Sequence, residues 1–260
     1  NGSRGVSPVS ATPSLKVLAP PHARMACCAI MLALDHLPFP GPDLAATAAA
    51  FAALGFTVTP SCTYTSPEYP DVVWNNRSVF LRRGWFDLLH APQAPAETPV
   101  GPRAALFLTD DLDAAGARFE GMRLHPAYRL DRRWEGAPEL GTETFRLFSI
   151  RERVSPLGLA VIEHPYPCPD TQPGWFDHAN GAVELAGLVF AGGAPGPFAS
   201  AAARILDLSG FEHWPTDLFG RRFGDAEVAV RVRTASLSSA RAALAPSVAV
   251  IETAEGLHVR

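Results

Sequence analysis

The sequence has little charge and lacks long hydrophobic runs. Charged residues make up 18% of the 260 residues, and the formal net charge is -4. Because the arginines are scattered along the chain, no basic surface for a nucleic acid is expected. The apolar run Ala26 to Leu34 is too short to cross a bilayer and is followed at once by Asp35 and His36. We therefore expect neither a nucleic acid nor a membrane as a partner.

Cysteine is also scarce. None of the four cysteines has the C-x-x-C spacing of zinc ribbons or redox motifs, and the adjacent Cys27 and Cys28 are poor partners for each other. This usage favours a reducing, cytoplasmic location. A secretory signal is the alternative, because His22 and Arg24 precede the apolar run, but no small-residue cleavage pattern follows.

Several catalytic motifs are absent. The sequence contains no G-x-S-x-G elbow, no Walker-type phosphate loop and no G-x-G-x-x-G segment that opens a helix. Their absence argues against a nucleotide-dependent enzyme.

The remaining composition is typical of a globular protein. Hydrophobic residues make up 47% of the chain, and the length allows a substantial core. Residues 1–24 are rich in Ser, Pro and Gly and show no periodicity. They are predicted to be a disordered tail or an expression-derived segment.

One order of elements occurs twice, as a strand, a helix and three further strands. In residues 31–91, Asp43 can cap a helix over 43–54 that Gly55 ends. The strands of this first module are predicted at 32–37, 56–59, 78–81 and 85–89. In residues 103–165 the same order recurs, with a helix from Asp110 to Phe119 and strands at 104–108, 123–130, 144–150 and 157–163.

A third, partial copy is predicted in residues 166–260, after a loop over 165–180. Its elements are a strand at 183–190, a helix at 197–208, strands at 211–214 and 227–233, a helix at 236–244 and strands at 247–251 and 256–259. The predicted fold class is α+β, with tandem βαβββ modules over residues 25–165. We expect them to pair within the chain as a cup-shaped mixed β-sheet with outer helices and a ligand pocket inside.

The motifs within this pattern resemble those of the vicinal oxygen chelate superfamily, the glyoxalase/bleomycin-resistance/dioxygenase group. They are L-D-H-L at 34–37, a D-L-A-A helix, G-F-x-V, N-x-x-V-F-L and W-F-D-L-L. The segment His178-Ala179-Asn180-Gly181-Ala182 is most similar to the glyoxalase-like proteins of that superfamily.

The resemblance implies a divalent metal ion, Zn, Mn, Ni or Fe, bound by a first-strand histidine and a last-strand glutamate. These positions are His36 and Glu163, and Asp87 stands where the first module has glutamate in the family. The strand 104–108 offers no histidine, so a complete ligand set is not visible. A hydrogen-bonded core histidine and an exposed strand end are the alternatives for His36 and Glu163.

Asp87 and His178 are the candidate catalytic residues for proton transfer. Strand alternation places Asp87 on one face with Trp85 and Leu89, and His178 lies in a loop that could close over the cup. A paired structural charge at Asp87 and a simple turn at Asn180-Gly181 are the alternatives.

Four residues are candidates for ligand binding. Trp74, Asn76 and Arg77 precede a strand, and Asn180 follows His178. Their amide and guanidinium groups suit an oxygen-rich ligand. A solvated hairpin is the alternative for the first three.

These features, with the resemblance, predict a metal-dependent lyase or isomerase acting on a small oxygenated organic molecule, with the cation stabilising an enolate. Two alternatives stay open. One is a non-catalytic protein that sequesters a small ligand, which the missing histidine favours. The other is a ring-cleaving dioxygenase with His178 as its second histidine. A homodimer through the third module also stays open.

Overall fold

The computed structural model describes residues 31–91, 101–154, 157–192, 202–246, 250–253 and 256–259. The sequence-based predictions for residues 1–24, for 197–201 of the helix at 197–208 and for 247–249 of the strand at 247–251 lie outside the described residues.

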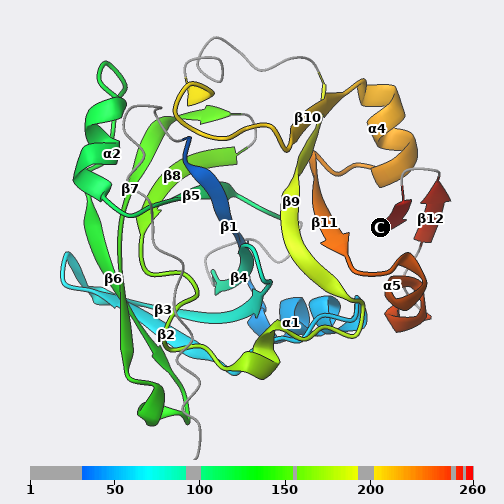
Figure 1. Ribbon diagram of the computed structural model, residues 1–260, viewed down its shortest axis with the longest axis horizontal. Helices are drawn as coiled ribbons and strands as arrows, with labels where there is room; N and C mark the ends of the chain where they lie inside the picture. The colour runs from blue at the N-terminus through cyan, green and yellow to red at the C-terminus, as the bar shows by residue number, and fades with distance from the viewer. Residues whose placement is uncertain are drawn as a thin grey trace, which may run out of the picture.

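A closed eight-stranded barrel forms the centre of the molecule (Figure 1), with the strand order β1-β4-β3-β2-β6-β7-β8-β5. The first module consists of β1 (Ala33–Gly41), α1 (Leu44–Ala53), β2 (Cys62–Ser66), β3 (Tyr69–Phe80) and β4 (Trp85–His90). The second consists of β5 (Ala104–Thr109), α2 (Leu112–Arg118), β6 (Tyr128–Trp134), β7 (Thr142–Val154) and β8 (Leu157–Glu163), with a short 3₁₀ helix η1 (Pro138–Leu140) between β6 and β7.

The two modules pair within the chain. Strand β1 runs parallel to β4 and β5 runs parallel to β8, whereas the modules join through the antiparallel pairs β1–β5 and β2–β6. The predicted fold class, α+β with tandem βαβββ modules and outer helices, is confirmed. The curled mixed sheet closes on itself, so the predicted cup is a barrel.

Strand alternation divides the buried side chains into two cores. On β8, Leu159 and Val161 belong to the outer core, between the barrel wall and the helices, while Ala160 and Ile162 belong to the core inside the barrel. Both faces of this strand are therefore apolar, which explains why it reads as a continuous hydrophobic run in the sequence.

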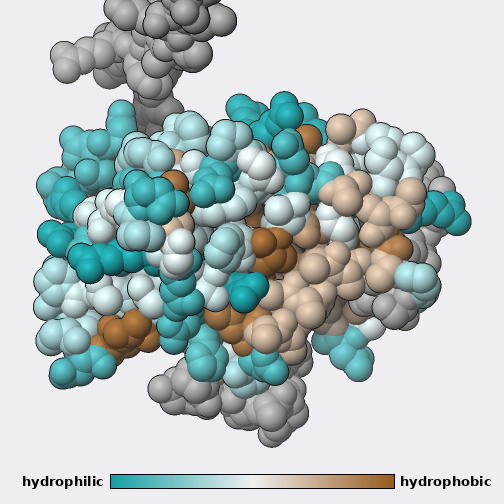
Figure 2. All heavy atoms as spheres, turned by 90° about the horizontal axis from the view of Figure 1, so that it is seen from below, coloured by the Kyte–Doolittle hydropathy of each residue, from teal (hydrophilic) through white to brown (hydrophobic). Residues whose placement is uncertain are grey.

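Both module helices begin after an aspartate cap, which is Asp43 as predicted and Asp111, one residue after the predicted start at Asp110. The carboxylate of Asp43 accepts a hydrogen bond from the Ala46 N–H at 2.9 Å, and Asp111 accepts one from the Ala114 N–H at 2.9 Å. Helix α1 packs on the barrel through Thr47, Ala48 and Phe51, and most of the alanines between them are exposed. Figure 2 views this side of the molecule and shows a band of moderately hydrophobic residues bordered by polar ones.

The third unit packs on the outer core. It consists of a 3₁₀ helix η2 (Pro173–Phe176), β9 (Ala182–Ala191), β10 (Phe211–Trp214), α4 (Thr216–Phe223), β11 (Val228–Thr234), α5 (Leu237–Ala243), β12 (Val250–Thr253) and β13 (Gly256–Val259). Strand β9 pairs with β10 in parallel and with β11 antiparallel, and β12 pairs with β13. Leu185, Leu188 and Phe190 of β9 join the outer core beside the barrel (Figure 1).

Several elements differ from the sequence-based prediction. Strand β2 was not predicted, the strand predicted at 123–130 lies at Tyr128–Trp134, and residues 203–208 of the predicted helix are not helical. Residues 56–59 do not form a strand, because the ladder with β3 begins only at Cys62, after Pro60, which has no N–H to donate. Helix α4 was not predicted. None of the helices within the described residues has the length and hydropathy that a membrane crossing requires.

Gly187 on β9 should not tolerate a side chain. Its φ is +142°, and a Cβ atom there would lie 2.0 Å from the Gly210 carbonyl oxygen. We expect Gly187→Ala to lower the free energy of unfolding by at least about 2 kcal/mol more than Gly136→Ala. Gly136 is the matched control, because its φ is also positive (+74°) but no atom lies within 4 Å of its Cβ position. Urea denaturation measures both, and equal losses would contradict this packing.

Candidate functional site

The interior of the barrel combines aromatic and ionisable side chains. The buried rings include Tyr64, Phe80, Trp85, Trp134 and Phe145. The buried polar residues along or next to the same wall are Asp35, His36, Asn76, Ser78, Asp87, Arg132, Glu143, His164 and Asp170. Ionisable groups this deeply buried need partners or have displaced pKa values, so the interior is the candidate site.

A bulge in β1 turns two consecutive residues inward. The pairing with β5 shifts between Leu34 and His36, so Asp35 is the extra residue on this strand. The His36 ring stacks on Trp85 with centroids 4.2 Å apart, and its Nδ1 lies 2.7 Å from Asp35 Oδ2. Asp35 and His36 are only 3% and 4% exposed. The bulge thus puts a carboxylate beside an imidazole inside the barrel.

His164 contacts the same carboxylate oxygen as His36. Its Nε2 lies 3.1 Å from Asp35 Oδ2, and its Nδ1 lies 2.7 Å from the Pro165 carbonyl oxygen. Because both ring nitrogens face acceptors, both carry protons and the ring is an imidazolium. Burial opposes this charge, but the hydrogen bond to Asp35 and the nearby Cys168 raise the pKa of His164 to about 10. Burial likewise opposes the charge of Asp35, yet the two histidines lower its pKa.

Asp87 has no comparable cationic partner. Its Oδ1 accepts a hydrogen bond from the Ser78 hydroxyl at 3.1 Å, and burial raises its pKa although the charges of His36 and Arg132 oppose the shift. The Asn76 amide lies close enough to favour the charged carboxylate, but among the described residues neither its nitrogen nor its oxygen has a partner at hydrogen-bond geometry. The indole nitrogen of Trp85 is also buried without a partner. Unpaired buried donors are rare in folded proteins, so this part of the wall is a candidate binding surface.

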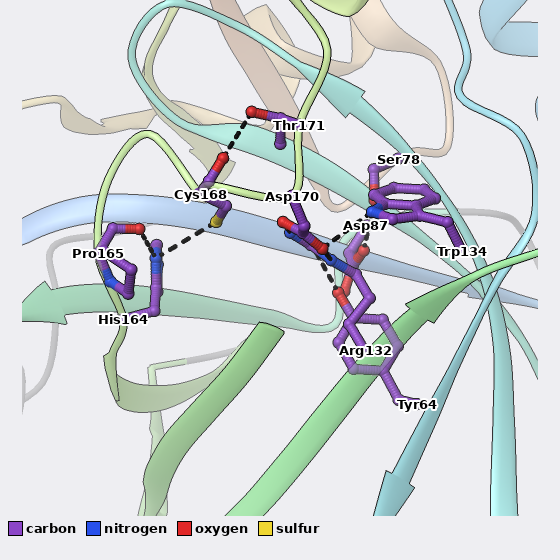
Figure 3. A network of polar contacts seen from close by, with 10 residues as sticks. All are labelled: Tyr64, Ser78, Asp87, Arg132, Trp134, His164, Pro165, Cys168, Asp170 and Thr171. Atoms are coloured by element: carbon purple, nitrogen blue, oxygen red, sulfur yellow. Dashed lines mark hydrogen bonds and ion pairs between the residues drawn. The ribbon is translucent and has the colours of Figure 1, made fainter. Parts of the chain in front are cut away.

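A second polar cluster is centred on Arg132 (Figure 3). This fully buried guanidinium donates to both Asp170 oxygens, from Nε at 2.9 Å and from Nη2 at 2.6 Å. Trp134 Nε1 donates to the same carboxylate at 2.8 Å, and Arg132 Nη1 donates to the Tyr64 hydroxyl at 3.3 Å. Aromatic rings surround the cation, the nearest being Phe145 with its centroid 4.8 Å away.

Asp170 belongs to a segment that covers the barrel. In residues 165–176, which connect β8 to the 3₁₀ turn, Cys168 and Asp170 are buried at the barrel interior. Trp175 packs on Trp134 at 4.5 Å, and Tyr166 stacks on Trp85 at 6.1 Å between centroids. The segment therefore covers the polar groups with aromatic rings, and the Arg132–Asp170 pair anchors it.

The sequence that forms this barrel also matches a known domain family. The profile of the glyoxalase-like domain matches residues 34–206, which is more than half of the chain. The chain belongs to the glyoxalase-like domain family. The resemblance inferred from the motifs is confirmed. No match was found among curated proteins.

Solved structures of methylmalonyl-CoA epimerase share part of the arrangement. The Streptomyces coelicolor enzyme, in complex with 2-nitronate-propionyl-CoA, is 19% identical to this chain, covers 52% of this chain and 99% of its own, and gives a TM-score of 0.36. The Mycobacterium tuberculosis enzyme is 16% identical, covers 55% of this chain and 94% of its own, and gives 0.37. Likeness of this degree says nothing about what this glyoxalase-like chain binds.

The structure does not bring together the two predicted metal ligands of the glyoxalase-like domain. His36 points into the barrel, whereas Glu163 lies on the helix side of the wall, where its Oε2 accepts from the Leu112 N–H at 2.9 Å and from Arg146 at 3.1 Å. The carboxylate thus supports the start of α2. Among the described residues, no three His, Cys, Asp or Glu side chains form a group that could hold a metal ion. The donor set does not fit the implied cation.

His178 and Asn180 lie outside the barrel and tie the loop to the first module. His178 Nδ1 accepts from the Thr57 N–H at 3.0 Å, and Nε2 donates to the Phe80 carbonyl at 2.8 Å. Burial lowers the pKa of His178, in agreement with a neutral ring. Asn180 donates to the Leu54 carbonyl and accepts from the Ala182 N–H. Both side chains therefore have backbone partners at the positions where a substrate contact was predicted.

The other predicted site residues divide by strand alternation. Asn76 faces the barrel interior with Asp87, whereas Arg77 is half-buried on the opposite face of β3. Trp74 lies further along the strand, edge-on to Tyr69 at 6.3 Å. The structure thus brings together His36, Asn76 and Asp87.

Sequence reasoning missed Asp35, Arg132, His164, Cys168 and Asp170. His164 follows a strand with two apolar faces, so the sequence of β8 does not tell which side is the interior. Arg132 lies in the charged run Arg129 to Arg133, which resembles a solvated strand. No local signal distinguishes it.

The Arg132–Asp170 pair should be strongly coupled. We expect Asp170→Asn to lower the free energy of unfolding by about 3 kcal/mol or more, because it leaves a buried guanidinium partly unpaired. Arg132→Met combined with Asp170→Asn should be less destabilising than the sum of the two single changes. Urea denaturation of the four proteins measures the coupling, and strict additivity would contradict it.

The imidazolium of His164 should make stability depend on pH. Its pKa is raised from 6.5 to about 10, so its contribution is complete below pH 6.5 and is lost as the pH rises towards 10. Asp35 has a lowered pKa, so its contribution is present above 3.8 and is lost at more acidic pH.

The stability difference between the unmodified protein and His164→Gln should therefore be largest between about pH 4 and 6.5. Urea denaturation at a series of pH values tests this, with the exposed His125→Gln as control. A difference that stays constant from pH 6.5 to 10 would be inconsistent with a buried imidazolium.

Proposed function

We propose that this glyoxalase-like protein is an isomerase- or lyase-type enzyme that transfers a proton on a small oxygenated organic molecule inside the barrel. Asp87 is the proton-transfer group. The observation that carries the proposal is a buried carboxyl group with a raised pKa that lies beside the unpartnered Asn76 amide and Trp85 indole.

Asp87 has the properties of a buried acid–base group. Removal from water destabilises its anion, and its hydrogen-bond donor is a neutral hydroxyl rather than a cation. A carboxylate of this kind is a stronger base than one on the surface, so it can accept a proton from carbon and return it. The charges of His36 and Arg132 oppose the rise in the pKa of Asp87 that burial causes.

Asn76 and Trp85 supply the neighbouring donors. Ser78 pairs with Asp87 and Phe80 pairs with Trp85 in the β3–β4 ladder, and alternation places Asn76 on the same face. A carbonyl oxygen of the substrate would accept from the Asn76 amide or the Trp85 N–H. When Asp87 removes a proton from the adjacent carbon, the same donors stabilise the negative charge that develops on that oxygen.

The proposal needs no step through a metal ion, because His36 and Glu163 lie on opposite faces of the wall. The alternative function is non-catalytic binding. Phe80, Trp85 and Trp134 line the interior with flat apolar surfaces that suit an aromatic ligand, and this arrangement favours sequestration as the second candidate.

Proton exchange from carbon tests the proposal without knowledge of the product. The protein is incubated in D₂O with a panel of 2-oxo acids, 2-hydroxyketones and acyl thioesters, and loss of the α-proton is followed by NMR. We expect exchange with at least one class, and Asp87→Asn should slow it by at least about 100-fold.

The matched control is Asp110→Asn, at an exposed carboxylate, which should exchange at the unmodified rate. Exchange that survives Asp87→Asn would rule out the proposed role of Asp87. A ligand-induced rise in melting temperature without any exchange would favour the binding protein instead.

A further inference from the structure

Cys168, His164 and Asp35 form a continuous chain of contacts within the barrel. Cys168 Sγ lies 3.5 Å from His164 Nδ1, and His164 Nε2 lies 3.1 Å from Asp35 Oδ2. Figure 3 shows the Cys168 thiol and the His164 imidazole pointing toward each other, both from the segment that follows β8. A nucleophile, a proton carrier and a carboxylate that orients the carrier are the three parts of an activated thiol site.

The position of the protons on His164 decides what the thiol experiences. Since Nε2–H donates to Asp35, the Nδ1–H is directed to the Pro165 carbonyl oxygen and to the sulfur. The sulfur is therefore in contact with the imidazole that can exchange a proton with it, as in cysteine–histidine nucleophile pairs.

The other charged groups around the sulfur are mostly paired with each other. Arg132 on β6 lies close enough for its charge to interact with Cys168, and Asp170 neutralises Arg132 through two hydrogen bonds. Tyr166, in the same segment as Cys168, donates its hydroxyl proton to the Leu81 carbonyl. The imidazolium remains the cation in direct contact with the sulfur.

An independent feature of the same place points to a ligand. Trp85 lies edge-on to the His164 ring, with centroids 5.1 Å apart, and is 1% exposed. Its indole nitrogen has no hydrogen-bond partner among the described residues. A donor buried beside the thiol is suited to an oxygen atom of a small molecule.

We propose that Cys168 is a nucleophile that adds to a small conjugated carbonyl compound in the barrel, with His164 as the proton donor and Asp35 as a positioning residue. The sulfur forms a bond to the β-carbon, and the carbon–carbon π bond shifts to give an enolate. The proton that His164 holds then passes to the α-carbon. The proton that the sulfur gives up when it adds then returns to His164. The net change is the addition of S–H across the carbon–carbon double bond, which needs no oxidant or reductant.

This reactivity is separate from proton transfer by Asp87, which lies on β4 and has its own hydrogen-bond partner in Ser78. The exposed Asp110→Asn should leave the reaction of Cys168 unchanged within a factor of about two. The two proposals can fail independently.

Cys62 provides a control within the same molecule. It is buried like Cys168, but burial raises the pKa of its thiol, and the charge of Asp87 adds to this effect. No imidazole is recorded in contact with it among the described residues. A difference in reaction rate between the two thiols therefore reports their surroundings.

The full chain, with Cys27 and Cys28 replaced by serine, is treated at pH 7 with methyl vinyl ketone, and adducts at each cysteine are followed over time by peptide mass spectrometry. We expect Cys168 to react at least about tenfold faster than Cys62. His164→Gln should slow Cys168 by about tenfold or more and leave Cys62 unchanged. Asp35→Asn should give a smaller loss at Cys168, and it replaces His164→Gln if that variant does not fold.

Circular dichroism and melting temperature establish that each variant is folded. Equal rates at the two cysteines, or no adduct at Cys168, would overturn the proposal. If neither His164→Gln nor Asp35→Asn changes the rate at Cys168 from that of the unmodified protein, the proposal is overturned as well, because a merely accessible thiol needs neither residue.

Discussion

The arrangement of charges in the barrel follows from one constraint, that an ion removed from water must have a partner. Arg132 meets it through two hydrogen bonds to Asp170, and His164 meets it through Asp35. A buried ion pair offsets the loss of hydration only when its two groups lie in close hydrogen-bond geometry, so these pairs hold their backbone segments in place. Since Asp170 comes from the loop after β8, the same contact that neutralises the guanidinium keeps the barrel covered.

Asp87 departs from this rule. Its donor is the Ser78 hydroxyl, and the nearby Asn76 amide and Trp85 indole also lack partners. Three incompletely satisfied groups on two adjacent strands are unfavourable for folding, and natural proteins keep such groups mainly where a ligand completes them. The ion pairs of Arg132 and His164 have their hydrogen-bond partners and hold the loop in place. The groups on β3 and β4 lack partners and are therefore available for chemistry.

Much of the fold could be predicted from the sequence. Asp43 and Asp111 mark helix starts, Gly55 and Gly121 follow the helix ends with positive φ, and the repeated order of elements indicates the paired modules. These are local signals. The closure of the sheet into a barrel is not local, because it depends on β2 pairing with β6 across some seventy residues.

The candidate site was predictable only in part. Strand alternation placed Asp87 on one face with Trp85, but the bulge at Asp35 breaks alternation, and no residue type signals it. The position of Glu163 followed from the family pattern, yet the strand has two buried faces, so its sequence does not tell which side is the interior. His178 resembled a catalytic residue because it sits in a polar loop, and its two backbone hydrogen bonds appear only in three dimensions.

The central claim, that Asp87 is a buried acid–base group, is tested most directly by measuring the pH at which its carboxyl group titrates. Selective ¹³C labelling of aspartate carboxyl groups, with Asp87→Asn to assign the resonance, allows its titration to be followed by NMR in the folded protein. The account predicts a titration clearly above the ordinary aspartate value of 3.8. A carboxyl group that titrates at or below that value would contradict it, because Asp87 would then be a solvated or fully paired charge with no proton to exchange.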